Sequence, residues 1–264
     1  MRRLIRLERW DGPTSGLCTD FAQMNLLVLP KKYASNFERF CQLNKKPCPL
    51  LEVFSPGNPR CQLLAPGADV RTDLPRYRIY HNGKLEQQVL NIRNWWQDDL
   101  VTFLLGCSFT FESALLKANI PVRHLELNRN VPMYITNIDC KPSGPFDSKM
   151  VVSMRPMTLA QAIEAFKITT RFPAVHGAPL CRIENDFNTL ITNPQELGIQ
   201  NINQPDFGAA VPIRSNEVPV FWACGVTSQL AALRANVDFF ISHAPGHMFI
   251  SDKRNEDLII TRII

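Results

Sequence analysis

The chain has 264 residues, of which 45% are hydrophobic and 20% charged, and its formal net charge is +5. Such hydrophobic content excludes a disordered chain, and the scattered lysines and arginines form no run typical of a nucleic-acid-binding arm. No apolar stretch approaches the length of a membrane-spanning helix, which leaves a globular protein of one large domain or two small ones.

Strands and helices are predicted to alternate along the chain. A short surface helix is expected within the first ten residues, and a hairpin should turn at Asn82-Gly83. Segment 100–105 is a strand or the end of a helix, and 185–203 is rich in loops. Other strands are predicted at 24–29, 123–126, 132–138, 151–154, 218–223, 239–242 and 248–251. Helices are predicted at 34–43, 111–118, about 159–166 and 227–235. The predicted class is α/β, with mixed α+β as the alternative.

Two segments resemble each other at a constant spacing of 117 residues. In this register Cys107 matches Cys224 and Thr110 matches Thr227, and a strand-like run follows each copy. Further matches align Glu126 with His243, and Pro30–Pro47 with Pro156–Pro173.

We therefore expect one compact unit over residues 1–264, with pseudo-repeats at about 22–140 and 148–253 packed about a pseudo-dyad. A smaller subdomain within 119–175 is an alternative division. The two segments also match if both merely use small helix formers and a terminal Asn. A duplicated unit would place equivalent parts around one cleft, so the site is expected at the repeated element.

The eight cysteines include no CxxC pair, and the basic N-terminus lacks an apolar leader core. We expect reduced thiols and a cytoplasmic protein.

Each repeated element is predicted to run from a strand into a helix through a turn, here called an elbow. Free backbone N–H groups at a helix start favour a carboxylate or phosphate. A thiol there has a lowered pKa and can act as a nucleophile or as an acid and base. The alternative is ordinary helix caps and buried thiols. The candidates are Cys107, Ser108 and Thr110 in one elbow and Cys224, Gly225 and Thr227 in the other.

His243 and His247 flank a Pro-Gly turn and are candidates for a general acid and base. A divalent metal is an alternative, although no third ligand has a recognised spacing. A purely structural histidine at the turn is another reading. We predict no cofactor, with a divalent metal left open.

Arginines near the predicted turns are candidates for binding a carboxylate. Arg129 and Asn130 lie in a polar loop after Glu126, which is a candidate base. Arg71 lies in a loop constrained by prolines, where it can equally pair with a neighbouring aspartate, and Arg155 follows a predicted strand.

Several motifs resemble the hydro-lyase family that includes D-glutamate cyclases, and together they cover most of the chain. They include Ala65–Tyr77, Gly106–Phe109, Arg129–Tyr134, Ser153–Pro156, Arg171–Gly177, Pro219–Thr227 and His243–Met248. The resemblance implies an α/β protein, and one branch of the family closes D-glutamate to 5-oxo-D-proline with loss of water. It implies no settled set of catalytic residues.

Such a cyclodehydration needs a base for the amine, an acid for the leaving hydroxide and donors for the oxyanion. We assign His243 or Glu126 as base and His247 as acid. Ser108 and Gly225 belong to the elbows expected to supply the oxyanion donors. Arg71, Arg129 or Arg155 would hold the second carboxylate.

A thioester on Cys107 or Cys224 is an alternative route. Two competing functions stay open: a non-catalytic carboxylate-binding protein and a Cys-dependent hydrolase. The expected partner is a small acidic substrate, with no nucleic acid or membrane, and a homo-oligomer is an option.

Overall fold

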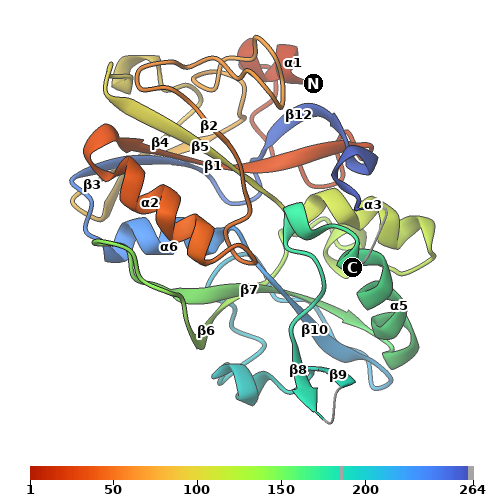
Figure 1. Cartoon of the computed structure of the whole chain (residues 1–264). Coiled ribbons are helices and arrows are strands. Elements are labelled where there is room, and N and C mark those ends of the chain that lie inside the picture. The colour runs from red at the N-terminus through yellow and green to blue at the C-terminus, as the bar shows by residue number, and fades with distance from the viewer. Residues whose placement is uncertain (185–186, 261–264) are drawn as a thin grey trace.

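A computed structural model describes residues 1–184 and 187–260, and Figure 1 shows its two main sheets one above the other. The helices are α1 (Arg2–Arg6), α2 (Lys31–Leu43), α3 (Phe109–Lys117), α4 (Arg123–Glu126), α5 (Leu159–Thr170) and α6 (Val226–Arg234), with 3-10 turns η1 (Arg93–Trp95), η2 (Pro173–Val175), η3 (Pro194–Leu197) and η4 (Asn255–Leu258). The strands are β1 (Phe21–Pro30), β2 (Leu50–Val53), β3 (Tyr77–His81), β4 (Lys84–Val89), β5 (Leu100–Gly106), β6 (Met133–Asp139), β7 (Lys149–Met157), β8 (Cys181–Glu184), β9 (Phe187–Leu190), β10 (Val218–Ala223), β11 (Phe239–His243) and β12 (Phe249–Arg254).

The larger sheet has the order β2-β5-β1-β11-β3-β4, and β12 also pairs with β1. Every pairing in it is antiparallel. β1 is buried along almost its whole length, because both faces of the sheet are covered. Helices α2 and α6 pack on one face through Phe37, Phe40 and Ala231. Segment 54–74 covers the other face.

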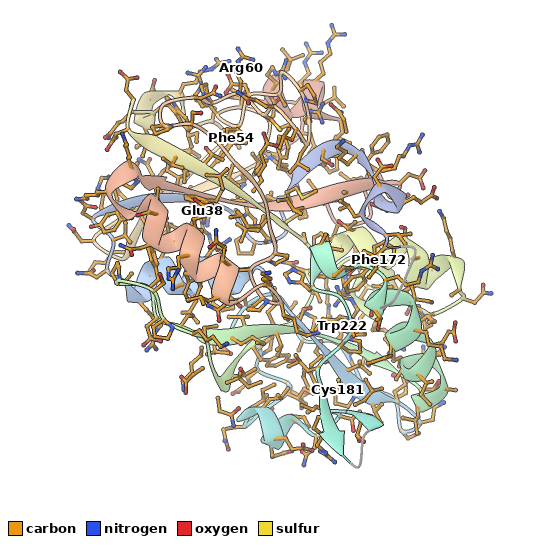
Figure 2. All side chains as sticks on the ribbon, viewed as in Figure 1. Glu38, Phe54, Arg60, Phe172, Cys181 and Trp222 are labelled. Atoms are coloured by element: carbon orange, nitrogen blue, oxygen red, sulfur yellow. The ribbon has the colours of Figure 1, made fainter. Side chains whose placement is uncertain are left out.

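The smaller sheet has the order β10-β7-β6 and is also antiparallel. Helices α3 and α5 cover one of its faces through Phe111, Leu115 and Ala162. Trp222 of β10 belongs to this cluster, and Figure 2 shows it between the small sheet and α5. The opposite face of the small sheet is covered by the loops and turns that carry Leu180, Leu197, Ile199 and Val211.

Two helices cross between the sheets. Helix α3 follows β5 of the large sheet, yet it packs with α5 on the small one. Helix α6 follows β10 of the small sheet, yet it packs on the large one. The turns at which the chain crosses are the two elbows of the sequence, at 106–109 and 223–226.

The mixture of helices and strands predicted from the sequence is confirmed, and since both main sheets are antiparallel it is the α+β alternative rather than α/β. Segment 100–105 is a strand. One local prediction was wrong, because segment 123–126 is the short helix α4 and not a strand. The stretch 185–203 is rich in loops as predicted, and it also contains strand β9 and turn η3. Residues 185–186 of that stretch lie outside the described residues. Within the described part of the chain, no helix is both long and apolar enough to cross a membrane.

Candidate functional site

The two elbows meet at a small cavity of about 20 Å³. Both buried thiols of the repeated element, Cys107 and Cys224, line it together with His243. The remaining lining residues are Asn25, Ser108, Phe109, Asn130, Val131, Met133, Val226, Pro245, Gly246 and Met248. The structure thus brings five of the sequence candidates to one place: Cys107, Ser108, Asn130, Cys224 and His243.

The two cysteines accept equivalent backbone hydrogen bonds at the start of their helices. The backbone N–H of Phe109, the first residue of α3, donates to the Cys107 sulfur. The N–H of Val226, the first residue of α6, donates to the Cys224 sulfur. Burial raises the pKa of Cys107 far above 9.0 and that of Cys224 to about 11, in spite of these N–H groups. Both are therefore protonated thiols at neutral pH, contrary to the lowered pKa expected from the sequence.

The threonines of the elbows brace the crossings instead of lining the cavity. Thr110 Oγ1 accepts the backbone N–H of Gln23 at 3.1 Å, and Thr227 Oγ1 accepts that of Val151 at 2.9 Å. Each hydroxyl thus ties its helix to the strand that pairs with the strand before it. Both side chains are fully buried, so their predicted role as substrate donors has no support in the geometry.

Asn25 links the two elbows and was not a sequence candidate. Its Nδ2 donates to the carbonyl oxygen of Gly106 at 2.7 Å. A Cβ added to Gly225 would lie 2.1 Å from the same nitrogen. Gly225 is therefore required by close approach, because its φ of −63° suits any residue. The signal in the sequence was one polar residue within the apolar run 24–29.

A buried ion pair supports the first elbow. Arg155 of β7 donates from Nε and Nη2 to Glu112 Oε1 of α3, at 3.1 and 2.5 Å. His124 Nε2 lies 3.2 Å from the same oxygen. Burial alone would raise the pKa of Glu112, but the charges of His124 and Arg155 hold it at about 2. The pair therefore stays ionised, and it ties α3 to the small sheet.

The same guanidinium reaches the cavity through Ser108. Arg155 Nη2 donates to Ser108 Oγ at 3.1 Å, while Nη1 donates to Ser153 Oγ at 3.1 Å. Because Ser108 Oγ accepts from a cation, its own hydroxyl hydrogen is left to donate. Arg155 itself is fully buried, so the structure does not place it where it would touch a substrate directly.

His243 is buried against β1 and α6. In the tautomer with its proton on Nε2, its Nδ1 accepts the backbone N–H of Leu26 at 3.1 Å. In the other tautomer, Nδ1 donates to the carbonyl oxygen of Leu26 at 3.2 Å. Gln229 Nε2 lies 3.1 Å from Nδ1 and 3.3 Å from the ring Nε2. Burial lowers the pKa of His243 to about 4. The ring is therefore neutral at pH 7 and suits hydrogen-bond donation better than proton removal.

Three other predicted residues lie outside the cavity lining. His247 Nδ1 lies 2.9 Å from its neighbour's carbonyl oxygen at Pro245, and the ring is partly exposed. Glu126 is exposed on α4 and pairs with Arg123 at 3.1 Å. Arg129 is exposed and donates to a backbone carbonyl oxygen. The expected equivalence of Glu126 and His243 was wrong, since one lies on a helix and the other on a strand.

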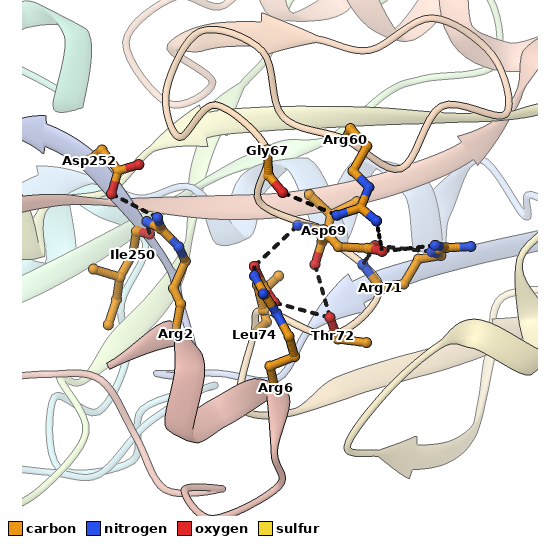
Figure 3. Close-up of polar contacts among 12 residues, drawn as sticks. Arg2, Arg6, Arg60, Gly67, Asp69, Arg71, Thr72, Leu74, Ile250 and Asp252 are labelled. Atoms are coloured by element: carbon orange, nitrogen blue, oxygen red, sulfur yellow. Dashed lines mark hydrogen bonds and ion pairs between the residues drawn. The ribbon is translucent and has the colours of Figure 1, made fainter.

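Arg71 also lies away from the elbows, in the segment that covers the large sheet. It donates from Nε and Nη2 to Asp69 at 3.0 and 2.8 Å. Figure 3 shows this pair, with Arg60 also approaching the Asp69 carboxylate. The Asp–Arg pairing considered from the sequence is thus formed internally.

Asn130 completes the polar lining of the cavity. Its Oδ1 is buried and has no hydrogen-bond partner, so it is an acceptor left for a bound donor such as an amine. Among residues 1–184 and 187–260, no three His, Cys, Asp or Glu side chains lie close enough to hold a metal ion.

A larger hollow of about 250 Å³ lies between α3 and η4. Its charged side chains face one another: Asp20 lies 3.8 Å from Lys117 and 3.9 Å from Arg254. The cavity at the elbows is the better candidate, because thiols, a hydroxyl, an imidazole and an unpaired amide oxygen converge there.

Comparison with known proteins agrees with the motifs of the sequence. Residues 101–252 match the family model described as D-glutamate cyclase. A relative from Bacillus velezensis is 52% identical over 260 residues, which cover 98% of this chain and 95% of that protein. One from Stutzerimonas stutzeri is 52% identical over 258 residues, covering 98% and 94%. YcsI of Bacillus subtilis is 51% identical over 260 residues and covers 98% of each chain. All three carry the name "putative hydro-lyase".

A solved nitrogen repressor-like protein from Methanococcus jannaschii matches with a TM-score of 0.36 at 10% identity, over 89% of this chain and 88% of that one. A likeness this loose carries no argument. The family match and the near full-length relatives do, and the chain belongs to the D-glutamate cyclase family of hydro-lyases.

Proposed function

We propose that this protein closes D-glutamate to 5-oxo-D-proline with loss of water, in the cavity between the two elbows. The observation that carries the proposal is the Ser108 hydroxyl, which lines the cavity and is backed by the buried Arg155–Glu112 pair. An acidic substrate needs such a donor, and a hydroxyl that accepts from a guanidinium is a strong one.

The reaction joins the substrate amine to its side-chain carboxyl carbon and breaks one carbon–oxygen bond. The amine must give up a proton, and the departing hydroxide must gain one, so that water leaves. Asn130 Oδ1, a buried acceptor without a hydrogen-bond partner, would accept from the amine. His243, in the tautomer with its proton on Nε2, would donate to the developing oxyanion.

The proton carriers would be Cys107 and Cys224, because Glu126 and His247 lie outside the cavity lining. A thiol whose pKa burial has raised to about 11, such as Cys224, can protonate a leaving hydroxide.

The cavity must open to admit a five-carbon substrate. Its volume of about 20 Å³ holds roughly one water molecule. The turn at Gly246 packs against Asn130, since a Cβ on Gly246 would lie 3.2 Å from Asn130 Oδ1. We propose that these two segments separate when substrate enters.

We further propose that the chain is a duplication, with copies at about 22–140 and 148–253 related by a pseudo-dyad through the cavity. Strand registers support it. Met24 of β1 faces Gly106 and Phe249, and Val152 of β7 faces Ala223 and Tyr134. Each residue of the first set has a counterpart at a fixed distance along the chain. Met24 and Val152 of the central strands are 128 residues apart, and Gly106 and Ala223, which end the strands before the elbows, are 117 apart. Tyr134 of β6 and Phe249 of β12 are 115 apart. The proline alignment, at an offset of 126, was two residues out of this register, because α2 begins at Lys31 and α5 at Leu159.

The six buried cysteines are thiols, which fits a reducing compartment, and we propose a cytoplasmic location.

The test of the proposed function is 5-oxoproline formation from D-glutamate by Ser108→Ala against the wild type. Loss of one donor to a developing oxyanion lowers kcat by about 10²–10³-fold. Ser113→Ala is the matched control, because Ser113 lies on helix α3, which begins directly after Ser108, and accepts from Asn255 outside the cavity. Equal activity in both variants would remove Ser108 from the mechanism.

A further inference from the structure

A cyclisation uses two proton carriers but does not require them to be alike, and this cavity offers a pair of equivalent thiols. Cys107 and Cys224 occupy the same position of the two elbows, and each sulfur accepts the N–H of the first residue of its helix. Both line the cavity, and the charge of one thiolate would act on the other thiol.

The neighbouring positions have not stayed alike. Ser108 stands opposite Gly225 in the repeat register, and Glu112 stands opposite Gln229. The threonines are alike, but they are bonded to strand backbone away from the lining. Cysteine is thus the one acid–base group that both elbows present to the cavity.

Two like groups around one substrate suit a reaction that inverts a carbon centre. One group removes a proton from one face, and the other delivers a proton to the opposite face. The roles exchange for the mirror-image substrate, so identical groups serve both directions. A one-way ring closure makes no such demand.

We propose that Cys107 and Cys224 also exchange the α-proton of glutamate or 5-oxoproline and so interconvert its D and L forms. This inference rests on the proposed function, since it requires that substrate bind in this cavity. The thiolate of one cysteine takes the α-proton, and the carbon–hydrogen electron pair passes into the adjacent carboxyl group as an enediolate. The thiol of the other cysteine then returns a proton to the opposite face. No atom is gained or lost, and no oxidant, reductant or cofactor takes part.

The residues around the two thiols suit both the removal of the α-proton and its return. The Ser108 hydroxyl, backed by Arg155, is a donor for the enediolate oxygen. The charges facing Cys107 are those of Arg155 and Glu112, and Arg155 also faces Cys224. Burial makes each thiolate scarce but strongly basic, as a weakly acidic carbon–hydrogen bond requires.

The experiment is incubation of the wild-type protein in D₂O with each enantiomer of glutamate and of 5-oxoproline. Proton NMR follows the α-proton signal, and chiral chromatography follows the enantiomers. We expect deuterium at the α-carbon and a slow appearance of the opposite enantiomer. Cys107→Ala and Cys224→Ala should each lower inversion by at least ~100-fold, and each should block exchange from a different enantiomer. Cys140→Ala is the control, as a buried thiol outside the cavity.

The outcomes separate this inference from the proposed function. If 5-oxoproline forms from D-glutamate without deuterium at the α-carbon above the protein-free rate, the cyclase stands and the exchange by paired thiols is overturned. Absence of both product and exchange overturns both. The wild-type measurement needs no variant, so poor folding of a cysteine variant cannot obscure the result.

Discussion

Glu112→Gln tests whether the buried ion pair holds the first elbow. The wild-type carboxylate is 2% exposed and is bonded to Arg155, whose guanidinium also stacks over Phe111 and Trp222 at 5.2 and 5.4 Å. Glutamine keeps the shape and one acceptor oxygen but removes the negative charge. Arg155 is then a buried cation without a counter-charge.

The expected loss follows from the pKa of Glu112, which lies at about 2 instead of the ordinary 4.5. At about 1.4 kcal/mol for each tenfold change in proton affinity, the folded state gains roughly 3 kcal/mol from the ionised form. Breaking a buried pair by removing one partner typically costs about 3–5 kcal/mol. We therefore expect Glu112→Gln to lower the free energy of unfolding at pH 7 by about 3 kcal/mol.

The pH dependence is the sharper part of the test. Since folding lowers the pKa of this carboxyl, its contribution is complete above about pH 4.5 and is lost as the pH falls towards 2. Urea unfolding, followed by tryptophan fluorescence, should show a constant gap between wild type and variant from pH 7 to 5, and a smaller gap at pH 3. Glu164→Gln is the control, because its pair with Lys167 is exposed and should contribute less than about 1 kcal/mol. A gap that is equally large at pH 3 and pH 7 would refute the electrostatic reasoning.

Three further predictions concern the cavity and its surroundings. Gly225→Ala should displace Asn25 and break its hydrogen bond to Gly106, which lowers the free energy of unfolding by roughly 1–3 kcal/mol and also lowers turnover. Thermal unfolding and 5-oxoproline formation measure the two effects. Wild-type values for both would contradict the close contact. The pH profile of kcat/KM should lack an inflection near 6.5 from His243, because its folded pKa is about 4. Its neutral form also makes stability fall as the pH drops from 6.5 towards 4, and His243→Gln should reduce that slope but not abolish it, because burial also lowers the pKa of His176 to about 4. Arg71→Ala should change turnover by less than about twofold, because substitutions away from the site typically have effects within ±0.5 kcal/mol. A large rise in KM would show instead that Arg71 binds the substrate.

Periodicity and turn residues were enough to predict most elements, because the apolar run 24–29 lies in a strand buried on both faces, and 218–223 is a strand whose last four residues are buried. The prediction of a strand at 123–126 was wrong, because four residues are too few to distinguish the strand period from the helix period. The crossing of α3 and α6 between the sheets was not predictable. An apolar helix face shows that it is buried, but it does not show which sheet buries it.

In the site, too, features that depend on neighbouring residues in the sequence were predictable, and contacts between distant residues were not. The repeat indicated that Cys107 and Cys224 would share one site, whereas Asn25 was missed, although it is the one polar residue in the apolar run 24–29. The pairing of Glu112 with Arg155 joins residues 43 positions apart, and no pattern along the chain specifies such a partner. The expected base Glu126 failed for the same reason, because register alone cannot show that its neighbourhood is a surface helix.

The most direct test of the central claim is proton NMR of the wild-type protein with D-glutamate and, separately, L-glutamate, each with and without added divalent metal. A D-glutamate cyclase should form 5-oxo-D-proline from the D isomer faster than it forms 5-oxo-L-proline from the L isomer. Formation of 5-oxoproline from neither isomer, under any of these conditions, would contradict the assignment of glutamate as the substrate.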